Sequence, residues 1–415
     1  MFALVAGGID GPVFAQDKSL EERLQALEEQ NTRLQRELEN QRETIADLQG
    51  RLESEGELEP APRRGGMDLG PVHLSAQGGL GFYHASSDGE NAHSDFRVRE
   101  AKVFLETPVW TDTYFFAELD LVTRETNDEF FHLGELYIDF ENVLRHWTDE
   151  NYLSLRAGRI DIPFGEEYLV RDSIDNPLIH NSLSDLWGVD EGIELYGRAL
   201  GFDYVLAVQN GGHPTLGDSD DDKAIAGRIG YNFGQRARLS FSGMRTGELH
   251  PENDEFSELW FGDGFFTAIG DAASTTSFEA TVFELDAQYF WKSGHLKAAG
   301  GFYDYRDDDS AGDNERDGYY YYVEALQNVT AKLYSAARFS HILTDRGLPI
   351  VGLGNFGEYM FGPLTDDLWR LSLGLGYRWS DNLIAKVEYS REEGRLTSGM
   401  DRQINAVAAE LAFKF

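Results

Sequence analysis

The strongest pattern in the chain is a regular alternation of apolar and polar residues, which is easiest to see in residues 403–415. From Asn405 onward one face is apolar and ends in two aromatics, at Val407, Ala409, Leu411, Phe413 and Phe415. A period of two predicts a β-strand whose faces meet different surroundings. About 9–11 such residues are enough to cross a bilayer as a tilted strand. Taken alone, the segment fits either a membrane-barrel strand or an edge strand of a soluble sandwich.

The same alternation recurs from residue 72 to the end, broken by turn residues. It predicts about 16 strands, at 72–84, 95–106, 112–123, 131–140, 151–160, 190–199, 201–210, 223–232, 236–245, 278–291, 294–305, 317–327, 330–341, 368–378, 383–391 and 403–415. Short connections such as 233–235 and 292–294 alternate with long ones such as 161–189, 246–277 and 342–367. Tight turns at one end and long loops at the other are typical of outer-membrane barrels, whereas a soluble sandwich has no reason to sort its loops.

The positions of aromatic residues favour the same arrangement. Large aromatics lie at or beside the short connections, at Trp110, Trp147, Trp291, Trp379 and Phe415. Aromatic side chains gather where a membrane meets water, so these residues fit a girdle at one lipid interface. The predicted fold class is therefore all-β, an antiparallel transmembrane β-barrel of about 16 strands. In the strand 95–106 the charges change parity near Arg99, which predicts a β-bulge or a different register there.

The N-terminal part of the chain follows another period. Apolar residues recur at alternating spacings of four and three between residues 20 and 52, which is a heptad seam typical of an α-helical coiled coil. The seam positions at which chains would associate include Leu24, Leu27, Asn31, Leu34 and Leu38, and leucine at both a and d does not by itself choose the number of strands. Residues 1–15 resemble the remnant of a secretory signal. The predicted organisation is thus a signal remnant at 1–15, a coiled coil at 16–55, a linker at 56–70 and a barrel at 71–415.

Composition excludes several classes of protein. With 41% hydrophobic residues the chain has enough apolar material for a large fold. The net charge of −37 argues against a nucleic-acid partner, which would require a basic face. The absence of cysteine excludes a disulfide framework and any thiolate site. The histidines show no metal-ligand spacing, and no catalytic triad can be located, so the sequence predicts no enzyme, no metal and no cofactor.

Four motifs follow one another in residues 95–210, namely FRVREAKVFLET, YFFAELDL, LRAGRIDIPFGEE and VDEGIELYGRALGFDYVLAVQNGG. With them the segment resembles the phosphate- and polyphosphate-selective porins (the porin O/P type) of bacterial outer membranes, and a coiled coil before the barrel fits that family too. The motifs cover the first half of the barrel, while the second half fits in pattern only. The resemblance implies a homotrimer of barrels of about 16 strands, with the third loop folded into each pore. Here that loop is 161–189.

The resemblance also implies that arginines and lysines along the pore select anions. Arg97 and Arg99 lie in the matching strand, and strand parity favours Arg156 over Arg159 as the residue facing the lumen. The third loop departs from a basic constriction, because it sets Glu166, Glu167, Asp172, Asp175 and Asp185 against Arg171. The candidate constriction and selectivity residues are therefore Arg97, Arg99, Arg156, Arg171, Asp172, Asp175 and Asp185.

Parity assigns further charged residues to the lumen. The basic ones, besides those above, are Arg198, Arg228, Arg236, Arg238, Lys297, Lys332, Arg338, Arg370, Arg378, Lys386 and Lys414. The acidic ones are Glu118, Asp120, Glu135, Asp139, Glu194, Glu284, Asp286, Glu324, Glu388 and Glu410. The predicted wall is therefore nearly balanced with a slight basic excess, which indicates a channel more firmly than it indicates a selectivity.

The third loop is rich in apolar residues, at Phe164, Leu169, Ile174, Leu178, Ile179, Leu183, Leu186 and Trp187. Apolar groups in that number are usually covered, so we expect the loop to fold into the barrel. The alternative is packing over the outer rim against a neighbouring protomer.

Two functions remain open at this stage. The first is a passive porin for small hydrophilic or ionic solutes, among them phosphate-type anions, in the bacterial outer membrane. The second is a structural anchor that links the barrel to the periplasmic wall through its coiled coil. Outer-membrane lipid and lipopolysaccharide would surround either one.

Overall fold

The computed structural model describes residues 66–122, 132–148, 152–186, 188–211, 221–249, 275–309, 315–355 and 364–415. They belong to one compact unit, Leu58–Phe415. The predicted signal remnant and coiled coil, and residues 56–65 of the predicted linker, lie outside the described residues. The last linker residues, Met67–Leu69, form a short strand, β1.

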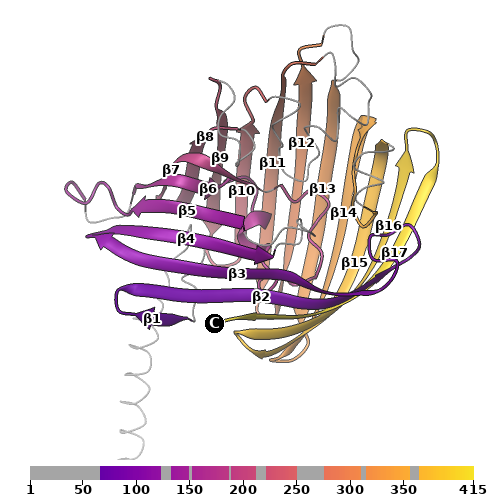
Figure 1. The fold of residues 1–415 in the computed structure, drawn as a ribbon, viewed down its shortest axis with the longest axis horizontal. Coiled ribbons are helices and arrows are strands. Elements are labelled where there is room, and N and C mark those ends of the chain that lie inside the picture. The colour runs from indigo at the N-terminus through magenta and orange to yellow at the C-terminus, as the bar shows by residue number, and fades with distance from the viewer. Residues whose placement is uncertain are drawn as a thin grey trace, which may run out of the picture. The chain divides into compact units, whose positions relative to one another are not determined.

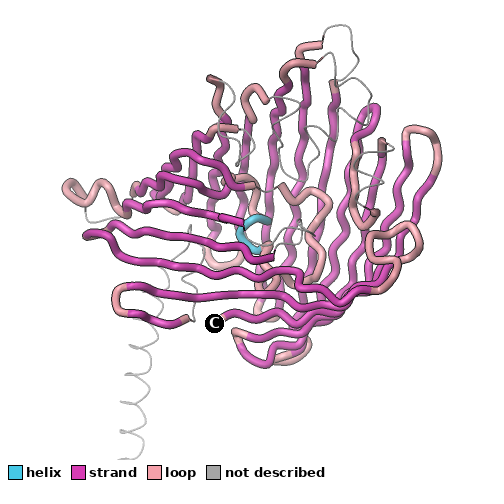
Figure 2. The backbone as a smooth tube through the Cα atoms, viewed as in Figure 1, coloured by secondary structure: helices cyan, strands magenta, loops and turns pink. Residues whose placement is uncertain are grey.

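Alternating residues form strands throughout the rest of the described chain. The strands are β2 (Val72–Ala85), β3 (Asp95–Trp110), β4 (Thr113–Val122), β5 (His132–Phe140), β6 (Ser154–Asp161), β7 (Val189–Ala199), β8 (Phe202–Gln209), β9 (Ala224–Phe233), β10 (Ala237–Arg245), β11 (Phe278–Trp291), β12 (Gly294–Asp307), β13 (Arg316–Asn328), β14 (Leu333–Leu348), β15 (Thr365–Ser380), β16 (Leu383–Leu396) and β17 (Asp401–Lys414). Each of the predicted strands is found, with most ends within a few residues of the prediction, while β14 and β16 extend seven and five residues beyond their predicted ends at 341 and 391. Figure 2 shows how little helix accompanies them: the described helix is the short 3-10 turn η1, Glu167–Val170.

Each strand pairs antiparallel with its neighbour in the chain, and β17 pairs with β2, so the sheet closes into a barrel. Figure 1 shows the strands following one another in chain order. Among the described residues the barrel strands are β2–β17, which confirms the predicted barrel of 16 strands. Strand β1 pairs antiparallel with β2 and forms a short hairpin with it. No helix among the described residues is long and apolar enough to cross a membrane.

The two faces of the barrel differ as the alternation predicts. In β13 buried and exposed residues alternate along nearly the whole strand. Outward side chains are apolar, as in the exposed Leu373 and Leu375 of β15 and Val387 and Tyr389 of β16. The predicted girdle aromatics are exposed at the short-connection end, and Trp110 and Trp147 are 76% and 80% exposed. An apolar outer face over a polar inner one suits lipid outside and ions inside.

The parity change in β3 is a β-bulge, as predicted. Glu100 pairs with Gly79, but the next pair along β2 joins Leu80 to Val98, so Arg99 is an extra residue. A bulge places two successive side chains on one face. Arg99 and Glu100 therefore both point into the barrel, and Lys102 follows them inward.

Inside the wall, three tyrosines lie over glycines on neighbouring strands. Tyr320 covers Gly301, Tyr303 covers Gly318, and Tyr334 covers Gly376, each pair being direct register partners. A Cβ at any of these glycines would overlap the ring. The arrangement covers the exposed backbone of a strand glycine with an aromatic face and fixes register.

We therefore expect Gly301→Ala to destabilise the barrel by about 1–3 kcal/mol, the usual cost of overpacking. The matched control is Gly300→Ala, where the added Cβ would meet only Tyr320 O and Tyr321 Cβ, both at 3.7 Å. The measurement is the temperature at which the folded barrel loses its fast mobility in a detergent gel. Equal transition temperatures for the two variants would show that the tyrosine rings move aside without cost.

Candidate functional site

The connection between β6 and β7, residues 162–188, runs inside the barrel and contacts the opposite wall. It begins with Pro163 and turns at Gly165, whose φ of +70° is in the left-handed region that favours glycine. A side chain at Gly165 would also collide with Glu284 of β11. The Pro-Phe-Gly sequence thus directs the chain from the end of β6 into the lumen, where η1 follows.

Arginines of β9 and β10 hold the first part of this loop. Arg228 Nη1 donates to Gly165 O at 2.8 Å, and Ser242 Oγ accepts from Gly165 N at 3.0 Å. Arg238 Nε and Nη2 both donate to Glu166 Oε1, at 3.0 and 2.8 Å. Arg238 also pairs with Asp203 of β8. Arg228 and Arg238 therefore hold the start of the loop inside the lumen.

The second part of the loop is held by β14, β15 and β16, largely through its main chain. Arg338 Nη1 donates to His180 O at 2.8 Å, and Arg370 Nη1 donates to Asn181 O at 3.2 Å. Glu388 accepts from the main-chain N–H groups of Ile179 and His180, the latter at 3.1 Å. The loop thus spans the lumen from β6 to the far wall.

Two loop residues in this contact have shifted pKa values. Burial lowers the pKa of His180, against the opposing effect of the Glu388 carboxylate 3.0 Å from its Nδ1. Burial raises the pKa of the Glu167 carboxyl, against the opposing effect of Arg338, 3.7 Å away. Glu167 accepts from Ser182 N at 2.8 Å and from the Ser182 hydroxyl, which closes the loop on itself.

Most apolar residues of the loop are buried against the wall, while Leu169 is partly exposed. Phe164, Leu183 and Leu186 belong to a cluster with residues of β9–β15, among them Tyr303, Tyr320, Ile342 and Leu368. Ile174 and Leu178 pack with Tyr334, Ile384 and Ala412, and Ile179 packs with Tyr83 and Ala408. The predicted inward fold of the loop is confirmed, and the alternative of packing over the outer rim is wrong. Trp187 lies outside the described residues.

Four of the seven predicted site residues keep contact with solvent inside the barrel. Asp172 is 24% and Asp175 47% exposed, and each faces a wall lysine: Lys102 Nζ is 3.4 Å from Asp172 Oδ1, and Lys414 Nζ is 3.6 Å from Asp175 Oδ1. Arg171 Nε lies 3.8 Å from Asp185 Oδ2. The partly exposed Arg97 donates to Asn91 Oδ1 at 2.7 Å.

The other three predicted site residues are buried in ion pairs. Arg99 Nη1 is 3.1 Å from Glu410 Oε2. Arg156 is held between Asp139 at 2.8 Å and Glu194 at 3.2 Å, and its guanidinium stacks on the rings of Tyr137 and Tyr196. Asp185 accepts from Asn181 Nδ2 and pairs with Arg171. Arg156 does face inward as parity predicted, while Arg159 donates to Gly134 O at 2.9 Å.

Sequence reasoning missed two residues of this site, Glu100 and Lys102. Glu100 Oε2 accepts from Ser173 N at 2.8 Å, and Lys102 contacts both Asp172 and Glu118. Both face inward only because of the bulge at Arg99, so strict parity assigns Lys102 to the lipid side. Lys102 and Lys414 stand at one level of the wall, since Gln77 of β2 is the register partner of both.

Two residues of the predicted lumen set are not on strands. Arg236 lies in the exposed turn between β9 and β10, and Lys332 in the exposed turn between β13 and β14. Their assignment to the wall was wrong because β10 begins one residue and β14 three residues later than predicted, which leaves Arg236 and Lys332 just before their strands. All ten acidic residues of the set are buried within the barrel or at its inner face, as parity requires.

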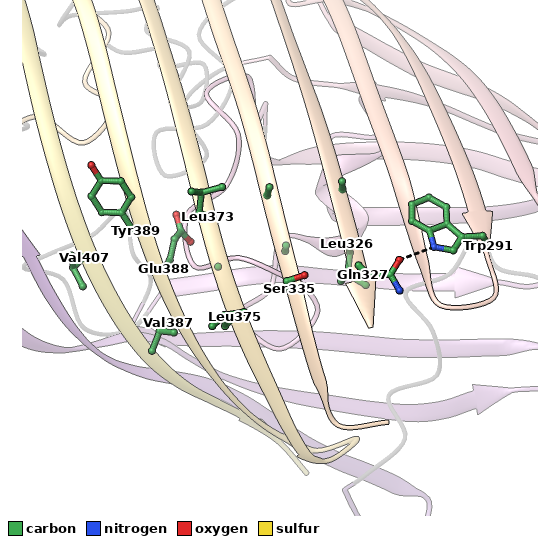
Figure 3. Close-up of a pocket in the computed structure, with 14 residues that line it drawn as sticks. Trp291, Leu326, Gln327, Ser335, Leu373, Leu375, Val387, Glu388, Tyr389 and Val407 are labelled. Atoms are coloured by element: carbon green, nitrogen blue, oxygen red, sulfur yellow. Dashed lines mark hydrogen bonds between the residues drawn. The ribbon is translucent and has the colours of Figure 1, made fainter. Parts of the chain in front are cut away.

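A hollow of about 650 Å³ lies on the outer surface of β13–β17 (Figure 3). It forms because small outward residues, Ala325, Ser335 and Ala337, stand between larger ones such as Leu373, Val387 and Val407. At the edge of the hollow, Trp291 Nε1 donates to Gln327 Oε1 at 3.0 Å.

Within the described part of the chain no group of three or more acidic or histidine side chains is placed to hold a metal ion.

No protein-family model and no curated protein sequence matches the chain. Solved structures do match it. The trimer form of OmpT, an outer membrane protein of Vibrio cholerae, aligns with a TM-score of 0.57 and 12% identity over 84% of this chain and 100% of that chain. The outer membrane channel DcaP of Acinetobacter baumannii gives 0.56 and 11% over 84% and 99%.

The anion-selective porin from Comamonas acidovorans gives a TM-score of 0.55 and 11% identity over 83% of this chain and 99% of that chain. At identities this low the similarity establishes only the fold, and a fold does not by itself determine a function. The closed antiparallel barrel of this chain is accordingly the fold of these outer-membrane proteins, channels and porins.

Proposed function

We propose that the protein is a passive diffusion channel for small ionic solutes in a bacterial outer membrane. The observation that carries the proposal is the loop 162–188, which crosses the lumen of a closed barrel and keeps paired charges at the solvent. A barrel that served only as an anchor has no need of a charged loop suspended across its interior. In a channel, such a loop brings fixed charges close to every permeating ion.

We propose that the passage is bounded by Arg97, Lys102, Arg171 and Lys414 on the basic side and by Glu100, Asp172 and Asp175 on the acidic side, all partly exposed. This lining is close to balance. Phosphate-type anions, which the sequence resemblance implies, would compete with the carboxylates that already contact Lys102 and Lys414. The arrangement therefore favours weak selectivity over a phosphate-specific site.

We also propose a homotrimer in which residues 16–55 form a periplasmic coiled coil. The regular heptad seam of Leu24, Leu27, Asn31, Leu34 and Leu38 supports it. The outward apolar face of the barrel would contact lipid and, in the outer leaflet, lipopolysaccharide.

The purified protein in planar bilayers is expected to form channels with a weak anion preference at low salt, because four partly exposed cations face three carboxylates. The preference should fall as salt rises, since screening shortens the reach of each charge. Single-channel conductance and the reversal potential across a salt gradient measure both quantities. A barrel that inserts without conducting would contradict the channel and favour the structural anchor.

A further inference from the structure

Lys386 of β16 is buried inside the barrel at the middle of the loop contact, and its side chain is 1% exposed. Its ammonium donates to three main-chain carbonyls of the loop: Ser173 O at 2.6 Å, Leu178 O at 3.0 Å and Asn176 O at 3.3 Å. Its Nζ also lies 2.7 Å from Glu410 Oε1 of β17. One cation is thus surrounded by three loop carbonyls and one wall carboxylate.

This environment explains how a lysine remains inside the barrel. A buried ammonium is costly unless it is paired and its three N–H groups are satisfied. Glu410 supplies the countercharge and the carbonyls supply further acceptors. Arg99 Nη1, at 3.1 Å, and the Tyr83 hydroxyl, at 3.3 Å, contact the other Glu410 oxygen, so the carboxylate is itself fixed from β2 and β3.

The contact acts on the loop backbone and not on its side chains. Three carbonyls that converge on one point define the curl of residues 173–178, whatever side chains the segment carries. Tyr334 reinforces the curl by donating to Pro177 O at 2.9 Å. Asp172 and Asp175 directly precede two of the anchored residues, so the same curl places their carboxylates opposite Lys102 and Lys414.

We propose that Lys386 is the positioning residue of the channel, whose ammonium holds residues 173–178 across the lumen and thereby sets the width and charge of the passage. The proposal rests on the proposed channel function. Lys386 does not itself line the passage. Its removal is nevertheless expected to change conduction more than the loss of one charge would.

The test compares Lys386→Ala with Lys332→Ala, which removes the same charge from the exposed turn between β13 and β14. Lys386→Ala should raise single-channel conductance and add fluctuations between levels, while Lys332→Ala conducts like the parent. Adding n-propylammonium should restore parent conductance to Lys386→Ala, because it fits the vacated space and carries three N–H donors. Tetramethylammonium, which has none, should not.

A second measurement follows the loop without using conduction. The chain has no cysteine, so spin labels at Asp175→Cys and at Val329→Cys, in the exposed turn between β13 and β14, report a single distance. The distribution of that distance should be narrow with Lys386 present, broad in Lys386→Ala, and narrow again with n-propylammonium. If Lys386→Ala does not fold, Lys386→Gln, which keeps two N–H donors, carries the same comparison with a smaller expected broadening.

The outcomes separate the two proposals. A parent protein that does not conduct overturns the channel function, while the distance measurement still decides whether Lys386 holds the loop. A parent that conducts, with unchanged conductance and distances in the Lys386 variants, overturns the positioning role. Rescue by tetramethylammonium as good as by n-propylammonium would also overturn it, because a donor to carbonyls would then be unnecessary.

Discussion

Deleting residues 173–184 is expected to raise single-channel conductance severalfold, because this segment fills the centre of the lumen between β14–β17 and β3. A flexible Gly-Ser linker joins Asp172 to Asp185 across the cut. Conductance is measured in planar bilayers at high salt, where the pore width dominates.

The same deletion removes Ile174, Leu178, Ile179 and Leu183 from the apolar clusters. Some loss of thermal stability should accompany it, and gel mobility checks that the barrel is closed. The control replaces the exposed turn 397–400 between β16 and β17 with Asn-Gly, which shortens the chain outside the lumen. If the deletion conducts like the parent while folded, the loop does not restrict the passage and the proposed site residues lose their basis.

Replacing both Asp172 and Asp175 with lysine is expected to move selectivity strongly toward anions. In the parent these carboxylates neutralise Lys102 and Lys414 at 3.4 and 3.6 Å. In the variant four ammonium groups would face one another across the passage, repelling cations in a space where salt screens poorly. The permeability ratio from reversal potentials at low salt should change severalfold.

The matched control makes the same charge change at exposed positions away from the loop, with Asp88→Lys in the turn after β2 and Asp401→Lys at the first residue of β17. It should shift the permeability ratio much less, since those charges are screened by bulk solvent. An equal shift in both double variants would mean that the overall field of the protein, and not the loop, sets selectivity.

Much of the fold was predictable because period two is a local property. A residue such as Leu373 or Val387 faces outward when its neighbours face inward, and that relation needs no knowledge of distant segments. The lengths of the connections then assign the ends of the barrel, and the aromatic residues beside the short turns agree. The inward fold of the third loop was predictable for a related reason, since so many apolar groups in one loop need cover.

The candidate site was predictable only in part. Asp172, Asp175, Arg171 and Arg97 do reach solvent in the lumen, but their partners Lys102 and Lys414 come from strands distant in the chain. Parity placed Lys102 on the wrong face, because one extra residue at Arg99 reverses the alternation beyond it. Arg99 and Arg156 carry the same charge as Arg97, yet they are buried in ion pairs that no local pattern encodes.

The sequence by itself determined the strands, their faces and the content of the loop, because each follows from local alternation and apolar count. Closure into a barrel was predicted from the sorting of short and long connections, and the pairing of β17 with β2 establishes it. Only the tertiary structure decided which charges meet. Lys386 is one lysine among several inward ones by parity, and its contact with three carbonyls of residues 173–178 arises when a loop from β6 reaches β16. Such contacts depend on three-dimensional distance between segments far apart in the chain, and a pattern read along one strand does not contain that distance.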